Sequence, residues 1–233
     1  MKYTALLPLF FMVSFQGMFA QSVHHSKQKE PITAAGHGIQ LDEIEEIVLR
    51  PTTTGTGFGV TLKVRPYVLL KDGTMYSRPD ASPHDLDVSR SKQQDPSKWG
   101  TWTRNGNALN INFKSPQNIT NYYKTVRAET GASISGCYKM VGTFPASTIH
   151  DFNTICFNSD KTFVWRYFYR NDGRFIPHST DRKIKGSYHI EDYTIIMTYE
   201  NGTVERHTFA KFAIENGVLI GSQAFAEFTN PGL

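Results

Sequence analysis

The chain has 233 residues, of which 39% are hydrophobic and 13% aromatic, so it can bury a sizeable core. Its 25 basic and 21 acidic residues leave a formal net charge of +4, and the basic residues are scattered along the sequence. Because nucleic-acid-binding proteins concentrate their basic residues in a dense patch, we expect no nucleic-acid partner.

The N-terminus has the pattern of a signal peptide. Lys2 is the only charge in residues 1–20, and the apolar run ALLPLFFMVSF is too short to span a bilayer as a helix. We place the cleavage site after Ala20, and no later segment is apolar enough for a transmembrane helix. The sequence therefore predicts an exported protein, periplasmic or secreted, without a transmembrane segment.

Residues 21–40 are polar without an apolar period, so we predict a flexible leader. Residues 41–50, LDEIEEIVLR, fit either a helix or an opening strand. Residues 82–100 are polar and rich in turn formers, and we expect a loop there with one short helix.

From Val60 onward the pattern is typical of antiparallel strands joined by tight turns. Segments rich in β-branched and aromatic residues alternate with Asn-Gly or Asp-Gly dipeptides, which favour hairpin turns. The five dipeptides are Asp72-Gly73, Asn105-Gly106, Asp172-Gly173, Asn201-Gly202 and Asn216-Gly217.

The chain also repeats itself. GTWTRNGNALNINF (100–113) aligns without a gap on GSYHIEDYTIIMTY (186–199), and KDGTMY (71–76) is similar to SDKTFV (159–164). Two similar units thus span about 60–120 and 150–212. We predict a single all-β domain over 41–233: an antiparallel meander barrel or sandwich of about 8–10 strands, built from two similar halves, with at most one or two short helices. In this interpretation each unit supplies half of one core.

One face of the second unit is a candidate binding surface. Counting back from a two-residue turn at Asn201-Gly202 places Arg206 on the apolar face, and an extra residue in that turn would reverse the assignment. A buried guanidinium needs a partner. Arg206 therefore either pairs with a local carboxylate or carbonyl, or holds an anionic group of a ligand at the barrel mouth. The candidate ligand-binding residues are Trp102, Tyr188, Met197, Tyr199 and Arg206.

The remaining chemistry-bearing residues indicate neither catalysis nor metal binding. Cys137 and Cys156 are expected to form a disulfide or to remain two buried thiols, and their spacing is not that of a zinc site. The same strand phasing puts His189 and His207 on the exterior about 12 Å apart, too far to share a metal ion. We find no catalytic motif, so we predict no catalytic residue and no cofactor.

Gly100-Thr101-Trp102, the hairpin meander and the export signal together resemble lipocalin-like or calycin-type barrels. LLKDGTMY, SRSKQQDPSKWGTW and GSYHIEDYTIIMTYENGTVERHTF also resemble uncharacterised secreted or periplasmic bacterial proteins. The lipocalin resemblance implies lipid- or retinoid-type binding. In lipocalins, however, the G-x-W motif lies on the first barrel strand, whereas here it lies in mid-chain.

These patterns lead to three functional hypotheses. The first is a non-enzymatic barrel that binds a small or amphipathic ligand at its mouth. The alternative is an envelope or extracellular protein-interaction module, of the adaptor, inhibitor or immunity type, with a filled core. The third is an enzyme on the same scaffold that uses Arg206 and tyrosines. A continuous interior cavity favours the first hypothesis, and a filled core with an exposed aromatic patch favours the second.

Overall fold

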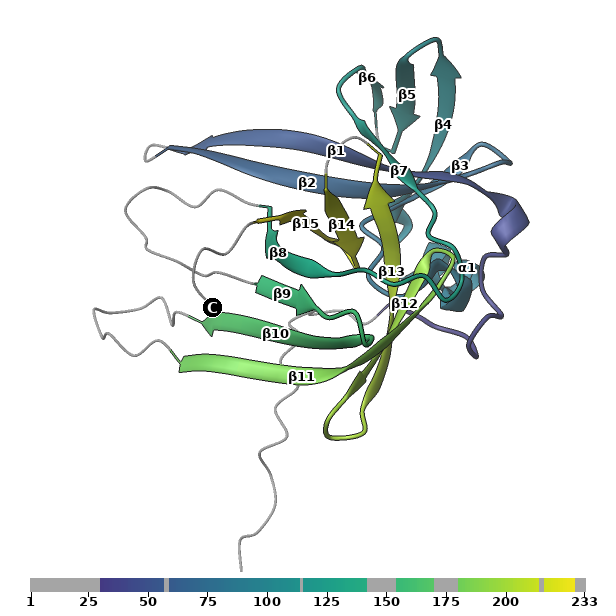
Figure 1. Ribbon diagram of the computed structural model, residues 1–233. Coiled ribbons are helices and arrows are strands. Elements are labelled where there is room, and N and C mark those ends of the chain that lie inside the picture. The colour runs from purple at the N-terminus through teal and green to yellow at the C-terminus, as the bar shows by residue number, and fades with distance from the viewer. Residues whose placement is uncertain are drawn as a thin grey trace, which may run out of the picture.

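The computed structural model describes residues 30–56, 59–113, 115–141, 154–169, 180–213 and 216–228. The predicted signal peptide and the predicted turn at Asp172-Gly173 lie outside these ranges. In Figure 1 a barrel lies below a long hairpin, and three further strands project above that hairpin.

Eight consecutive strands form the closed barrel. Each strand pairs antiparallel with the next, and the last pairs with the first. Closure leaves none of the eight as a free sheet edge, which is how up-and-down barrels avoid edge-to-edge association. The predicted all-β antiparallel barrel is confirmed. The strands are β8 (Gly136–Met140), β9 (Thr154–Phe157), β10 (Thr162–Tyr169), β11 (Thr180–Glu191), β12 (Thr194–Tyr199), β13 (Val204–Phe212), β14 (Gly217–Ile220) and β15 (Gln223–Glu227).

The N-terminal part forms a second antiparallel meander, which remains open. A separate short strand, β7, pairs with β1 on one side and with β13 on the other, so it joins this sheet to the barrel. The strands are β1 (Ile44–Thr56), β2 (Gly59–Leu70), β3 (Thr74–Ser77), β4 (Trp99–Asn105), β5 (Ala108–Asn112), β6 (Pro116–Ile119) and β7 (Tyr123–Val126).

Helical structure is confined to short segments, as predicted. The helix expected within residues 82–100 is α1 (Val88–Gln94), and Asp87 caps it by accepting a hydrogen bond from the backbone N–H of Arg90. The 3-10 turns are η1 (Leu41–Glu43), η2 (Pro83–Asp85) and η3 (Pro96–Lys98). Residues 41–50, which the sequence left open, therefore form a 3-10 turn and the start of β1.

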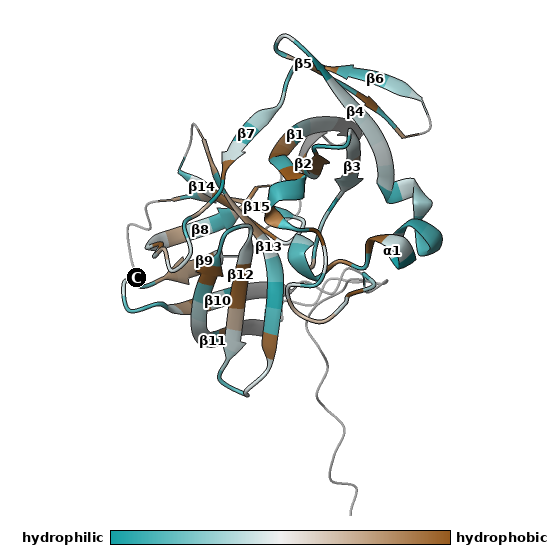
Figure 2. Cartoon of the chain, turned by 90° about the vertical axis from the view of Figure 1, so that its right-hand side faces the viewer, coloured by the Kyte–Doolittle hydropathy of each residue, from teal (hydrophilic) through white to brown (hydrophobic). Residues whose placement is uncertain are grey.

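Three hydrophobic clusters hold the fold together, and strand alternation separates them. Phe209 of β13 points into the barrel cluster, whereas its neighbour Ala210 points out. On β14, Val218 points in and Leu219 points out. The outward residues pack against the sheet, so the second cluster is the interface between the two units. The third lies on the other face of the sheet. Figure 2 shows hydrophobic residues on barrel strands β9 and β12 and hydrophilic residues on α1 and β6.

The internal repeat is a repeat of strand register. Trp102 pairs with Ile111 on the neighbouring strand, and the aligned residue Tyr188 pairs with Met197 in the same way. The aspartates repeat too, since Asp72 accepts hydrogen bonds from the backbone and hydroxyl of Thr74, and Asp160 does the same with Thr162.

We expected each of the two similar units to supply half of one shared core, but they are assembled differently. The barrel takes all its strands from residues 136–227, and the first unit forms a sheet with its own cluster outside it. Closure needs β15 to reach β8, as in the pairing of Phe225 with Met140, and the first unit has no counterpart to that last hairpin.

The β12–β13 turn is one residue longer than predicted. Thr198 pairs with Val204, and Gly202, with a φ of 80°, donates its N–H to the Tyr199 carbonyl. Three-residue hairpin loops with glycine in the left-handed region are a common alternative to two-residue turns. The extra residue places Arg206 opposite Ile196 on the outer face. The prediction that Arg206 shares the inner face with Met197 is therefore wrong.

The segment preceding β1 is bonded to the body. Residues 30–39, which the polar pattern assigned to the leader, run along 83–87 with hydrogen bonds such as Gly38 N–H to the His84 carbonyl. The Glu30 carboxylate is 4% exposed and accepts hydrogen bonds from the backbone N–H groups of Asp80 and Ala81 and from Lys98 Nζ. These donors explain how a charged residue is accommodated there.

Candidate functional site

In the described part of the barrel, a cluster of buried side chains occupies the interior. Tyr188 and Met197, both predicted to line a ligand site, lie in this core. The Tyr188 hydroxyl donates to the Ile134 carbonyl at 2.7 Å and accepts from the Ile134 N–H at 3.0 Å, so its polar group is satisfied internally. Its ring centroid lies 5.0 Å from that of Phe157. An eight-stranded barrel is narrow enough for side chains to fill it, and Tyr188 and Met197 are such residues here.

Tyr199 belongs to a polar cluster at one end of the barrel. Its hydroxyl donates to Glu205 Oε2 at 2.7 Å, and His207 Nε2 lies 3.0 Å from the same oxygen. His207 Nδ1 lies 3.3 Å from the Asp80 carbonyl oxygen. The shifted register turns His207 inward, opposite Ile195, so the prediction that it lies on the exterior is wrong.

The pKa of His207 is raised by this cluster. Burial alone would lower it, but the Glu205 carboxylate and the negative charge and backbone carbonyl of Asp80 favour the imidazolium and raise the pKa above its usual value. The group therefore carries a proton over a wider pH range than a free histidine.

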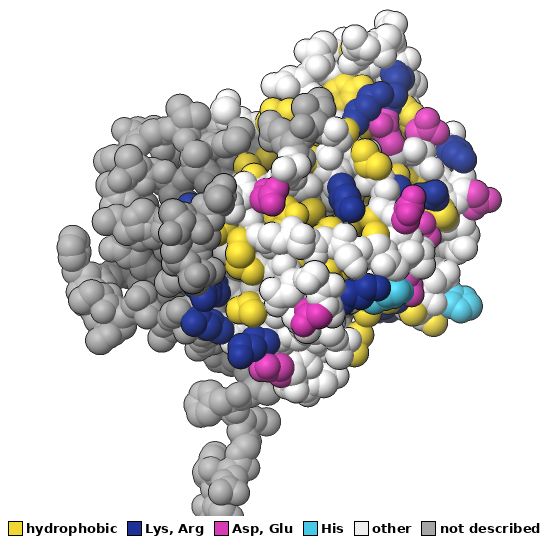
Figure 3. All heavy atoms as spheres, viewed as in Figure 1, with side chains coloured by type: hydrophobic (Ala, Val, Ile, Leu, Met, Phe, Trp, Pro, Cys, Tyr) yellow, Lys and Arg dark blue, Asp and Glu magenta, His cyan; other side chains and the backbone are white. Residues whose placement is uncertain are grey.

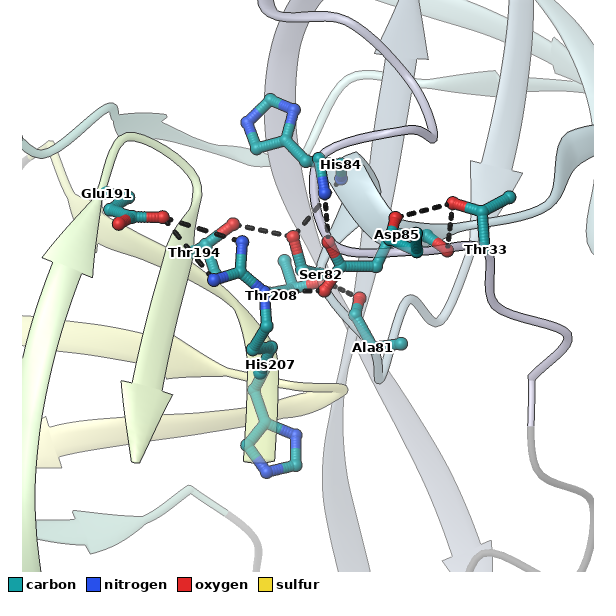
Figure 4. Close-up of polar contacts among 12 residues, drawn as sticks. Thr33, Ala81, Ser82, His84, Asp85, Glu191, Thr194, His207 and Thr208 are labelled. Atoms are coloured by element: carbon teal, nitrogen blue, oxygen red, sulfur yellow. Dashed lines mark hydrogen bonds and ion pairs between the residues drawn. The ribbon is translucent and has the colours of Figure 1, made fainter. Parts of the chain in front are cut away.

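Arg206 is paired with two carboxylates, those of Asp85 and Glu191, which are labelled in Figure 4. Its Nε donates to Asp85 Oδ2 at 2.8 Å, and its Nη1 lies 3.4 Å from Glu191 Oε2. Asp85 also accepts the N–H of Gly36 at 2.9 Å. Of the two roles considered for Arg206, the structure shows the local ion pair, which joins the barrel to the 80–85 segment.

Two further bonds reinforce the same connection. The hydroxyls of Ser82 and Thr194 lie 2.6 Å apart, and the Thr208 hydroxyl donates to the Ala81 carbonyl at 2.7 Å (Figure 4). The 80–85 segment therefore lies against β13 as part of the unit interface.

Trp102 lies in the first unit, away from the other candidates. Its Nε1 donates to the Leu70 carbonyl at 2.9 Å, and its ring packs partly buried against the sheet cluster. The five predicted ligand-binding residues thus lie in separate places: in the barrel core, at the barrel end, on the outer face of β13 and in the sheet.

An open cleft of about 670 Å³ lies where the two units meet. Its residues come from η1 and the start of β1, from the end of β2, from the segment after β7 and from the β11–β12 turn. Ligand sites occur preferentially at such interfaces, and this volume is in the usual range for them. We call it the junction cleft; its lining residues are Gln40, Leu41, Asp42, Ile44, Glu45, Lys71, Arg127 and Tyr193.

The junction cleft combines an apolar floor with charges of both signs. Ile44 and Tyr193 are buried members of the interface cluster. Burial raises the pKa of Tyr193, against the opposing effect of the Arg127 charge, so its hydroxyl remains neutral. Arg127 Nε lies 3.7 Å from Asp192 Oδ1, but half of its side chain is exposed and free to contact a ligand.

Sequence reasoning did not identify this cleft because its lining comes from four separate segments. One local signal was available. Tyr193, a large aromatic residue, follows Asp192 in a two-residue hairpin turn, and Asp192 has a φ of 51°. An aromatic residue at a hairpin tip indicates that the tip packs against another part of the chain.

Cys137 and Cys156 form a disulfide between neighbouring strands β8 and β9, which decides between the two expectations for them. The described residues include no helix long and apolar enough to cross a membrane. The same residues contain no group of three or more His, Cys, Asp or Glu that could hold a metal ion.

Fold and site together define an eight-stranded antiparallel barrel protein with an attached sheet, a shape consistent with the lipocalin-like resemblance. No protein-family model, curated protein or solved structure matches the chain.

Proposed function

We propose that the protein is an exported, non-enzymatic interaction module that binds an extended segment of a partner protein in the junction cleft. The observation that carries this proposal is the cluster of buried side chains inside the described part of the barrel, which includes Tyr188 and Met197, two of the five positions expected to contact a small ligand. Binding is then a property of the outer surface, where the junction cleft is open to solvent.

Export is supported by two independent features. The N-terminal pattern is that of a signal peptide, and the Cys137–Cys156 disulfide suits an oxidising compartment. The calycin-type assignment rests on the eight-stranded barrel alone, and we keep it as part of this proposal.

A peptide segment suits the cleft better than a lipid. Lipid pockets are mostly apolar, whereas this cleft places Asp42 and Glu45 beside Lys71 and Arg127 around an apolar floor. A peptide that carries charged and apolar side chains can satisfy both kinds of group.

Panning a displayed peptide library tests this function. The cleft variant is Glu45→Lys with Lys71→Glu, which exchanges two exposed charges and keeps the net charge. The matched control is Glu129→Lys with Lys124→Glu, two exposed residues that do not line the cleft. We expect enriched peptides to bind the wild type and the control equally and the cleft variant about tenfold more weakly. If no peptide is enriched, or if peptides bind the cleft variant equally well, the proposal is wrong.

A further inference from the structure

Tyr193 has a hydroxyl group that the described chain leaves without a hydrogen-bond partner. The residue is 7% exposed, and its side chain belongs to the buried interface cluster. Its hydroxyl nevertheless makes no hydrogen bond within the described residues. A buried tyrosine hydroxyl usually has a partner, because leaving a buried polar group unpaired costs free energy. Since Tyr193 lines the junction cleft, this hydroxyl is available to a ligand there.

The hydroxyl end of Tyr193 faces the junction cleft. Burial raises the pKa of Tyr193, and the charges of Arg127, Asp192 and Glu45 also act on this pKa. Two of these charged residues, Arg127 and Glu45, line the cleft, so the hydroxyl lies on that side. The Phe209 N–H donates to the Tyr193 carbonyl at 2.7 Å, which fixes the turn against β13. A group held in this way loses little conformational entropy when it binds a ligand.

Arg127 supplies an available guanidinium on the same side of the cleft. Ala128 packs in the barrel cluster, and the Gly131 N–H donates to the Ile190 carbonyl at 2.8 Å, so the segment after β7 is held against β11. Arg127 Nε lies 3.7 Å from Asp192 Oδ1, which is too far for a hydrogen bond. Its nitrogens make no hydrogen bond within the described residues. Such a guanidinium can bind a carboxylate through two parallel hydrogen bonds.

The other charges of the cleft come from the sheet. Asp42 lies in η1 and Glu45 at the start of β1, and the Lys71 N–H donates to the Glu43 carbonyl, which places Lys71 beside them. Figure 3 shows acidic and basic side chains interspersed with hydrophobic ones on the right of the view, where β1 begins in Figure 1. The sheet side thus has two carboxylates and one ammonium group. The barrel side has one guanidinium, one carboxylate and a neutral hydroxyl, so an anionic group finds its donors on the barrel side.

We propose that the partner segment in the junction cleft presents a carboxylate group to Arg127 and to the Tyr193 hydroxyl. This assignment rests on the proposed function and names the group that the cleft recognises. The neutral hydroxyl donates one hydrogen bond, and the guanidinium donates two and compensates the negative charge. A cationic group is a poorer match, because Arg127 would repel it. The carboxylate belongs either to the C-terminus of the partner or to an aspartate or glutamate side chain, which offer the same chemistry.

Affinity selection from synthetic random-sequence peptides with free C-termini tests the proposal. Peptides that bind the wild-type protein are remade in two forms, one with an amidated C-terminus and one with Asp and Glu replaced by Asn and Gln. The test variants are Tyr193→Phe and Arg127→Gln. The controls are Tyr123→Phe and Arg90→Gln, which change exposed residues on β7 and α1 that do not line the cleft. Urea unfolding of each variant reports its stability.

We expect one of the two peptide changes to weaken binding to the wild type more than about tenfold, which identifies the source of the carboxylate. The same change should alter binding to Arg127→Gln less than about threefold, because the guanidinium that the carboxylate contacts is already absent. Tyr193→Phe should weaken binding of the unmodified peptides and leave the urea midpoint unchanged, since its hydroxyl makes no described hydrogen bond. Both controls should bind like the wild type.

The possible contrary results are distinguishable. If peptides bind but neither change weakens them, the carboxylate is not the recognised group, while the cleft remains a peptide site. If Tyr193→Phe binds as tightly as Tyr123→Phe, the Tyr193 hydroxyl does not contact the ligand and the proposal is wrong. A lowered urea midpoint with unchanged affinity would give this hydroxyl a structural role instead. If no peptide binds the wild type, both the carboxylate site and the proposed function are wrong.

Discussion

Replacing Arg206 by leucine should destabilise the protein, because the arginine neutralises a buried carboxylate. The Asp85 side chain is 5% exposed, and Arg206 Nε donates to it at 2.8 Å. Without the guanidinium, the hydrogen bond from the Gly36 N–H is the one that remains to this carboxylate among the described residues. Removing one partner of a buried pair costs about 3–5 kcal/mol. Because Arg206 is itself 23% exposed, water can enter the vacated site, and we expect a loss of about 2–3 kcal/mol.

Urea unfolding followed by circular dichroism measures this loss. For an m value of about 2–3 kcal/mol/M, the midpoint should fall by about 1 M. Arg127→Leu is the matched control, because Arg127 is 51% exposed and lies 3.7 Å from Asp192; it should cost less than about 1 kcal/mol. Adding Asp85→Asn to Arg206→Leu should cost less than the sum of the single changes. An Arg206→Leu midpoint equal to that of the wild type would show that the guanidinium does not stabilise the buried Asp85 carboxylate.

Three further predictions use the same unfolding assay. Because the pKa of His207 is raised in the folded protein, its contribution to the free energy of unfolding is present below about pH 6.5 and is lost as the pH rises through the folded pKa. The His207→Gln variant should lack this pH dependence. If the stability of both proteins declined in parallel over this pH range, the prediction would be wrong. Replacing Cys137 and Cys156 by serine should cost about 3 kcal/mol for their separation of 19 residues, and a wild-type midpoint unaffected by reductant would exclude this role. Gly100→Ala and Gly186→Ala should each cost several kcal/mol, because the added methyl group would meet the carbonyl oxygen of Asn112 in the first variant and of Thr198 in the second. The control Ser187→Ala should have little effect. Unfolding midpoints equal to that of the wild type for both glycine variants would count against the shared register.

The repeat could be predicted because it depends on local pairing. Residues that align in sequence, such as Trp102 and Tyr188, hold equivalent register positions, since each hairpin is set by its own turn and its own alternation. Closure could not be predicted in the same way. It requires β15 to pair with β8, and no local pattern specifies which distant strand edge meets which.

The error at Arg206 has a similarly local cause. Asn201-Gly202 is compatible with a two-residue or a three-residue hairpin loop, and the choice reverses the faces of every later residue on β13. The sequence therefore identified Arg206 as a residue needing a partner, but placed it inside the barrel rather than against Asp85.

The junction cleft was hidden for a related reason. It depends on how the sheet packs against the barrel, which is set by outward residues such as Leu219 and Ala210.

Native mass spectrometry most directly tests the claim that the barrel is filled and that binding takes place outside it. The protein would be purified from its own secretory compartment and weighed before and after denaturation. We expect the mass of the chain alone in both spectra. A bound small molecule that disappears on denaturation would contradict it and would restore the barrel-mouth hypothesis.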